Sequence, residues 1–414
     1  MLHDRRPAAS RVACACAMAV ATAAAPVREP PDAILAIPRA PLVESREHLA
    51  DLQGRRGGID VRLLLQPEHA VQNRRLLDAA SHTLRYYTQS FGPYPYAGLT
   101  IVDVPRRSGL GGRAYAGLIT IESRWLVMSG SLSPEVSVAR GIAQQWWRQV
   151  VDDEPLLDGL VEYSQGLAIQ QLFADRHGAP AYSMLEARFF GGFVPWTFRR
   201  VLLDRKSAER TRAGRAFLTL ERYLGWPALQ RSLAVVVANA GPVPMTRDQF
   251  FRVLGDAAGQ SLEWFANAVF DRADHFDYAM TDLNSTPATD CAFRPCFRTR
   301  VVARRHGAAF TGSSREPVGE YESGRAIAVL VTFADGTKTS DTWDGRAASK
   351  AFTYVSRAEA VAARIDPDDM LALDTNSTNN SQRLVGSPAA AANRWTAEWT
   401  IWFQDLLLSC ASLV

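Results

Sequence analysis

The 414-residue chain is almost without lysine: Lys206, Lys338 and Lys350 are the only three, and arginine supplies the rest of its 46 basic residues. The 43 acidic residues nearly balance them, so the formal net charge is +3. Proteins that bind nucleic acids electrostatically concentrate positive charge, whereas these arginines are scattered. With 47% hydrophobic and 21% charged residues, the composition is that of a globular protein. We therefore predict no nucleic-acid partner and a globular chain of two or three domains.

Side chains that bind metals are also scarce. None of the seven histidines lies within five residues of another, and none belongs to an HExxH sequence. The spacing therefore offers no histidine pair for zinc. Cys291 and Cys296 could close a small loop as a disulfide, but two cysteines without a second pair are a weak metal signal. No cofactor is expected from these residues.

The N-terminus carries arginines ahead of an apolar run from Val12 to Ala25, which ends in small residues. This order is typical of a secretory signal, and the run is too short for a comfortable membrane span. Residues 1–30 are therefore predicted to form a signal-like or irregular leader.

The C-terminal segment, residues 386–414, is amphipathic and aromatic. Trp395, Trp399 and Trp402 recur at a spacing of three to four residues. This pattern predicts a tail helix that either lies in a membrane interface through residues 395–414 or packs on its own protein. Together the two ends predict a membrane-associated or exported protein, with a cytoplasmic location as the alternative.

Hydrophobic periodicity divides the rest of the chain. Residues 31–62 are expected to be largely irregular. Between residues 63 and 275 the pattern is mainly helical, with a few short β-branched segments that predict strands. Between residues 276 and 385 the period changes to that of strands, with Asp335-Gly336 as a hairpin turn. The second region is therefore predicted to be a small β-sandwich, and the fold class is α+β.

Two consecutive helices are predicted near the centre. Ser133-Pro134-Glu135 supply an N-cap, a proline at the first helical position and an acid in the first turn. The helix that they open, "EVSVARGIAQQWWRQVV", carries apolar residues on one face. A second helix is predicted from Leu156 to Ala174. The first helix contains neither histidine nor cysteine.

Four motifs occur in one order: "GPYPYAGLTIVDVP", "GGRAYAGLITIE", "ARGIAQQWWRQVV" and "LLDGLVEYSQGLA". They resemble those of the alanyl-type zinc aminopeptidases, a gluzincin metallopeptidase family, and especially its bacterial membrane-linked members. The resemblance implies a thermolysin-like, mainly helical domain with a small sheet at residues 63–275. A remnant of the family's N-terminal β-domain would precede it at 31–62, and the β-sandwich at 276–385 and the tail helix would follow.

The resemblance also shows which family residues are replaced. Arg140 and Gln144 stand where the family has the two histidines of its HExxH zinc motif. Gly141 stands at the glutamate that acts as general base, and Asp158 at the third, glutamate ligand. The "TRAG" match places Thr211 at the catalytic tyrosine. All of these catalytic and metal positions are therefore only family equivalents, and the zinc of the family is not expected here.

The resemblance further implies a substrate cleft along a glycine-rich edge strand. Arg113 and Ala114 stand where many members have Met-Glu, whose glutamate binds the free amine of the substrate. The predicted cleft residues are Gly112, Arg113, Ala114, Tyr115, Gly117 and Glu162. We expect Arg140, Gly141 and Gln144 to line the same solvated cleft, and Arg140 to pair with Asp158.

The first hypothesis is therefore an inactive homologue of zinc aminopeptidases that binds peptides or protein N-termini, or acts as a scaffold, at a membrane. A second is an active metallopeptidase whose unusual metal site uses Asp158, Glu162 and a distant histidine such as His177. A third is an interaction protein whose β-sandwich and tail bind partners, which a cleft blocked by Arg140 would favour. A fourth is a truncated gene product without function.

Overall fold

A computed structural model describes residues 42–50, 58–105, 108–123, 133–177, 205–272, 274–309 and 326–386. The predicted leader and nearly all of the predicted tail helix lie outside these ranges. Within them, no helix is both long enough and apolar enough to cross a membrane. The combination of helices and sheets confirms the α+β class.

The N-terminal region is built on a five-stranded sheet with the order β1-β2-β3-β5-β4. The strands β2, β3 and β5 run parallel, and the outer strands β1 and β4 are antiparallel to their neighbours. Their bounds are β1 Val43–Leu49, β2 Ile59–Leu65, β3 Gly98–Asp103, β4 Ala114–Tyr115 and β5 Leu118–Ile121. Among the described strands, the short strand β4 is thus the last one on its side of this sheet.

The prediction that residues 31–62 are largely irregular is wrong for Val43–Leu49, which form β1. Strand β1 pairs with β2 over its whole length, and the expected boundary at residue 63 divides β2. Only Leu49 of β1 is buried, so this edge strand lacks the alternation of polar and apolar residues that marks a half-buried strand.

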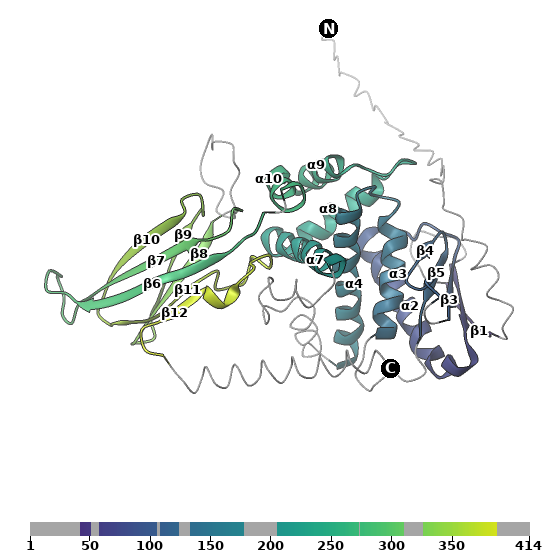
Figure 1. Cartoon of the computed structure of the whole chain (residues 1–414), viewed down its shortest axis with the longest axis horizontal. Coiled ribbons are helices and arrows are strands. Elements are labelled where there is room, and N and C mark those ends of the chain that lie inside the picture. Colours follow the sequence, from purple (N-terminus) through teal and green to yellow (C-terminus); the bar gives the residue numbers. More distant parts are fainter. Residues whose placement is uncertain are drawn as a thin grey trace, which may run out of the picture.

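Helices cover one face of the sheet and extend away from it (Figure 1). The helices α2 and α3 pack on each other and on the sheet, α4 packs on α3, and α7 packs on α4. Trp146 and Trp147 of α3 are buried against Tyr87 and Phe91 of α2. The elements are η2 Pro67–Gln72, α2 Asn73–Phe91, α3 Ser133–Trp147, α4 Glu154–His177, α7 Arg205–Leu224, α8 Trp226–Ala238, α9 Arg247–Ala258, α10 Glu263–Ala266 and η4 Asn267–Asp271.

The C-terminal region is a β-sandwich, as predicted, and it extends beyond the helices on the side away from the first sheet (Figure 1). One sheet has the order β10-β7-β6 and the other β12-β11-β8-β9. Asp335-Gly336 does turn the chain between β8 and β9. The strands are β6 Tyr278–Pro287, β7 Phe297–Arg305, β8 Ile327–Phe333, β9 Lys338–Trp343, β10 Ser349–Ser356, β11 Ala360–Ile365 and β12 Ser381–Arg383.

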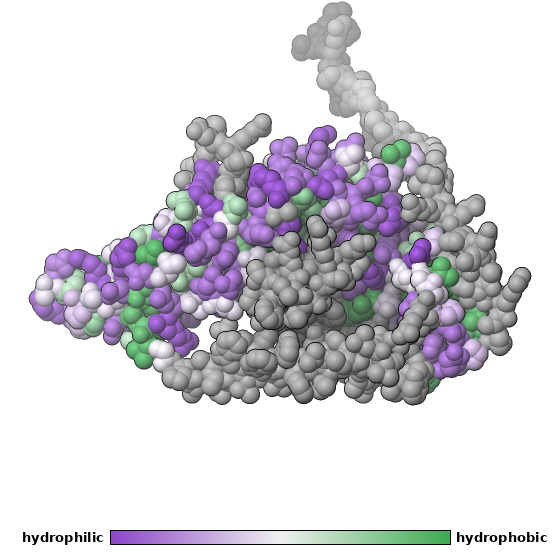
Figure 2. Space-filling view, in the orientation of Figure 1, coloured by the Kyte–Doolittle hydropathy of each residue, from purple (hydrophilic) through white to green (hydrophobic). Residues whose placement is uncertain are grey.

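Strand β6 was not predicted from the sequence. Its register with β7 shifts between Met280 and Asp282, so the alternation of buried and exposed residues breaks within the strand. Cys291 and Cys296 form a disulfide across the loop between β6 and β7, in agreement with their spacing. On the face seen in Figure 2 the described surface is mostly hydrophilic. The exposed large hydrophobic residues of the described ranges are all valines, such as Val71 and Val243.

Candidate functional site

The centre of the candidate site lies between α3 and α4. Arg140 of α3 donates to Glu162 of α4 at 2.8 Å and to Asp158 of the same helix at 3.4 Å. Asp158 and Glu162 are one helical turn apart, so their carboxylates share a face. The Arg140 side chain is 21% exposed, that of Asp158 36% and that of Glu162 14%. A guanidinium therefore joins the two helices through two partly buried carboxylates.

The expected pair of Arg140 and Asp158 is present, but Glu162 is the closer partner. The sequence prediction assigned Glu162 to the substrate cleft, in which Arg140 was also expected to lie. Five donors in a planar fork let one arginine bind two carboxylates. The trio carries one positive and two negative formal charges.

Gly141 does not line a solvated cleft, contrary to the sequence prediction. It is buried, and a Cβ atom added there would lie 2.9 Å from Ile119 Cδ1 and 3.1 Å from Ile119 Cβ and Cγ2. Ile119 is itself fully buried in β5. The absence of a side chain at Gly141 lets α3 approach the sheet closely, so a glutamate could enter only if the two elements moved apart.

Gln145, rather than Gln144, carries the polar contacts on this part of α3. Gln145 is 2% exposed; it accepts a hydrogen bond from the Tyr94 hydroxyl at 2.6 Å and donates to the Tyr115 carbonyl at 2.6 Å. Gln144 is half-buried. Sequence reasoning did not single out Gln145, although the segment "AQQWW" showed two adjacent amides before the tryptophans. Gln145 fixes edge strand β4 to the helix.

The predicted cleft residues Gly112 to Gly117 form a hairpin with β5. Ala114 lies opposite Ile119 and Tyr115 opposite Leu118, while Gly112 donates its amide to the Thr120 carbonyl. The Arg113 side chain folds back onto the Gly109 carbonyl at 2.7 and 3.1 Å. The structure thus brings five of the six cleft residues together on the hairpin and places Glu162 with Arg140.

Gly117 also borders a groove on the same sheet. The groove has a volume of about 810 Å³ and is lined by residues of β1, β2 and β3, among them Arg46, Asp60 and Gly98. The chain reverses at Gly117 with a positive φ of 63°, a conformation that favours glycine. The remaining predicted residue, Thr211, belongs to α7. Its side chain lies outside the described part of the structure.

The residues at the family-equivalent positions do not fit a zinc ion. Zinc requires several anionic or imidazole ligands at about 2 Å. Arg140 brings a positive charge and already binds Asp158, Gln144 offers only a neutral amide, and there is no room at Gly141 for a carboxylate base. Among the residues that the structure describes, no group of three or more His, Cys, Asp or Glu side chains is arranged to hold a metal.

Comparison with known proteins concerns the fold alone. No protein-family model and no curated protein sequence matches the chain. Among solved structures, the crystal structure of Legionella pneumophila aminopeptidase A in complex with aspartic acid matches with a TM-score of 0.52 and 10% sequence identity. The match covers 81% of this chain and 38% of that one. The chain therefore has an aminopeptidase-like fold and spans well under half the length of that enzyme.

Proposed function

We propose that the protein is a non-catalytic relative of the gluzincin zinc aminopeptidases, which binds peptides or protein N-termini and acts at a membrane. The observation that carries the proposal is Arg140, whose guanidinium joins Asp158 and Glu162 at the family's metal position. Without a metal, no hydroxide nucleophile forms at neutral pH by lowering the pKa of bound water. The close packing of Gly141 on Ile119 leaves no place for the general base.

Peptide binding would use the hairpin of β4 and β5. Strand β4 is the edge of its sheet as far as the strands are described, and extended peptides pair with sheet edges through their backbone. Gln145 holds Tyr115 of this edge in place, which keeps the edge preorganised. Under this proposal, the chain keeps the surface that binds peptides but lacks the centre that would hydrolyse them.

Two measurements test the proposal. The first is hydrolysis of aminoacyl amides by the full chain with zinc supplied in excess, for which we expect no turnover. The second is binding of a peptide library with free or acetylated N-termini, for which we expect binding that weakens in the Gln145→Met variant but not in Gln144→Met. Turnover would overturn the non-catalytic assignment, and the absence of any peptide binding would overturn the retained surface.

The alternative of an active enzyme with an unusual metal site gains little support from the structure. Asp158 and Glu162 do share a face of α4, but His177 ends the same helix. It lies about 15 residues beyond Glu162, or ~22 Å along the axis, so the three cannot share an ion. A partner-binding role of the β-sandwich is the second candidate, and the Arg140 pairs, which close the former reaction centre, favour it.

A further inference from the structure

The outer strands of a sheet present unpaired backbone groups, and natural proteins protect them with charges, bulges, prolines, short lengths or covering elements. The outer strands of the described sheets are β1, β4, β6, β9, β10 and β12. Strands β4 and β12 are short, and β1 and β9 carry charges of both signs. Strand β6 has a register shift after Met280, and it packs against β11 and β12. Strand β10 is the exception.

Strand β10, Ser349–Ser356, has the sequence "SKAFTYVS". It pairs with β7 over all eight residues without a register shift, and no described strand pairs with its other side. The sequence is rich in aromatic and β-branched residues, which favour strands, and Lys350 is its one charged residue. Val355 is 50% exposed, although valine is usually buried. The strand therefore offers a long, nearly uncharged edge for pairing, at the margin of the sandwich (Figure 1).

The charge of Lys350 is engaged within the same sandwich. Its ammonium nitrogen donates to the Thr342 carbonyl of β9 at 2.8 Å and lies 4.8 Å from the centre of the Phe352 ring. Phe352 is buried and stacks on Tyr354, so alternate residues of β10 face the inside of the sandwich. Thr353 lies on the other face of the strand, where it is exposed. Since side chains stand roughly perpendicular to a sheet, the backbone groups along the edge stay accessible to another strand.

We propose that β10 pairs antiparallel with β10 of a second copy of the chain, in a dimer with twofold symmetry. The two three-stranded sheets then join into one sheet with the order β6-β7-β10-β10-β7-β6. Residues that lie opposite each other in such a pair share a face of the sheet, so pairing along the strand brings Lys350 opposite Tyr354 or Ser356 of the second copy. No like charges meet, and the exposed Val355 gains an uncharged neighbour. The edge is therefore complementary to itself, which favours a second copy over an acidic or basic partner.

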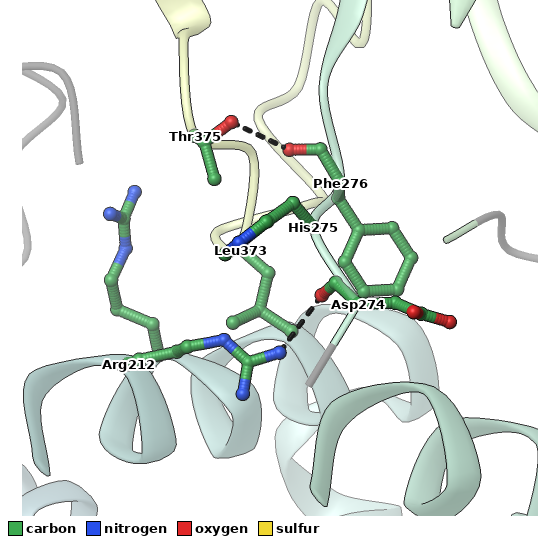
Figure 3. A pocket seen from close by; sticks show the side chains of 7 residues that line it. Arg212, Asp274, His275, Phe276, Leu373 and Thr375 are labelled. Atoms are coloured by element: carbon green, nitrogen blue, oxygen red, sulfur yellow. Dashed lines mark hydrogen bonds between the residues drawn. The ribbon is translucent and has the colours of Figure 1, made fainter. Parts of the chain in front are cut away.

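The sandwich is anchored to the helical region, so a dimer through β10 also places the helical regions of both copies. Arg212 of α7 donates to the Asp274 carbonyl at 2.9 Å, in the segment that leads into β6. The Thr375 hydroxyl donates to the Phe276 carbonyl at 3.1 Å, and Figure 3 shows both bonds at this junction. The sheet of β1 to β5 lies at the opposite end of the molecule from the sandwich (Figure 1). Pairing through β10 therefore leaves the hairpin of β4 and β5 uncovered, and a dimer presents two such hairpins.

Sedimentation velocity of the full chain at increasing concentration tests the dimer. One pair of strands buries little surface, so we expect a dimer that dissociates on dilution, with a dissociation constant on the order of 10–100 μM. Thr353→Lys places a positive charge beside the twofold axis in both copies and should raise this constant about tenfold. Thr286→Lys is the matched control, because Thr286 of β6 lies opposite Arg298 as Thr353 lies opposite Arg300, and both threonines are exposed. A monomer throughout this range, or a dimer that Thr353→Lys leaves unchanged, would overturn the proposal.

Hydrogen exchange of the unmodified chain gives a second readout, which does not depend on the folding of a variant. We expect the amides of β10 to exchange more slowly as the protein concentration rises, whereas those of β1, another outer strand, keep one rate. Exchange in β10 that is independent of concentration contradicts pairing between copies, even where Thr353→Lys fails to fold.

Discussion

Arg140 of α3 and Glu162 of α4 are joined at the candidate site, with 2.8 Å between guanidinium nitrogen and carboxylate oxygen. Asp158 joins the same guanidinium at 3.4 Å. The arrangement puts a fixed organic cation where the related peptidases are expected to hold a metal cation. The arrangement forms a structural cross-link between the helices and, under the proposed function, takes the place of a reaction centre.

Removal of the guanidinium should destabilise the fold. In Arg140→Met the two carboxylates lose the guanidinium that joins them, and we expect a loss of about 1–2 kcal/mol in unfolding free energy, because the group is only partly buried. Urea denaturation measures this loss. Arg74→Met serves as control, since its pair with Asp78 is on an exposed helix surface and should cost less than about 0.5 kcal/mol.

A double-mutant cycle tests whether Glu162 is the principal partner. Glu162→Gln should lose most of its effect when Arg140 is already methionine, with a coupling energy of about 1 kcal/mol. Asp158→Asn should couple more weakly, because its contact is longer and more exposed. Equal effects of Glu162→Gln in both backgrounds would contradict the cross-link.

Substitution of Gly141 by alanine should change the unfolding free energy in the direction opposite to that usual for a helix. Glycine to alanine within a helix normally stabilises by up to about 1 kcal/mol. Because a Cβ at Gly141 would meet buried Ile119 at 2.9 Å, we expect Gly141→Ala to destabilise instead, by about 1–3 kcal/mol. Gly241→Ala is the control, since nothing lies within 4 Å of its added Cβ. A more stable Gly141→Ala variant would show that α3 has room at this position.

Gln145 should matter more than its neighbour Gln144. Gln145→Met leaves the Tyr94 hydroxyl and the Tyr115 carbonyl without their partner, at a cost of about 1–3 kcal/mol. Hydrogen exchange should also accelerate in the hairpin of β4 and β5. Gln144→Met on the same helix should change neither quantity appreciably, and similar effects for the two variants would contradict the assigned role.

The junction of the two regions should respond to pH through Asp374. This carboxyl is 5% exposed, and burial raises its pKa from 3.8 to about 6, although the amide of Asn376, the side chain of Asn380 and the amide of Tyr278 oppose the shift. Since the folded state favours the protonated form, its contribution to stability is complete below about pH 4 and is lost as the pH rises through 6. Denaturation at about pH 4 and about pH 7, on the two sides of this window, should show a smaller pH difference in Asp374→Asn.

Much of the fold follows from sequence patterns, and the exceptions have physical causes. The helix opened by Ser133-Pro134-Glu135 and the turn at Asp335-Gly336 both form as predicted. Strands β1 and β6 were missed because one is an exposed edge and the other contains a register shift. A strand is recognised in a sequence when buried and exposed residues alternate along it. Neither β1 nor β6 shows a regular alternation.

At the candidate site, the sequence predicted an ion pair but not how closely the elements pack. Opposite charges at Arg140 and Asp158 suggested the ion pair from sequence. The burial of Gly141 depends on how closely α3 approaches β5, and the choice of Glu162 over Asp158 depends on the rotation of α4. Both are tertiary properties, which a one-dimensional motif does not contain.

The most direct test of the central claim is the metal content of the full chain, purified without added metal and measured by mass spectrometry, with aminoacyl-amide hydrolysis assayed on the same sample. The account predicts substoichiometric zinc and no turnover. Stoichiometric zinc together with turnover would contradict it and would require ligands outside the Arg140, Gln144 and Asp158 positions.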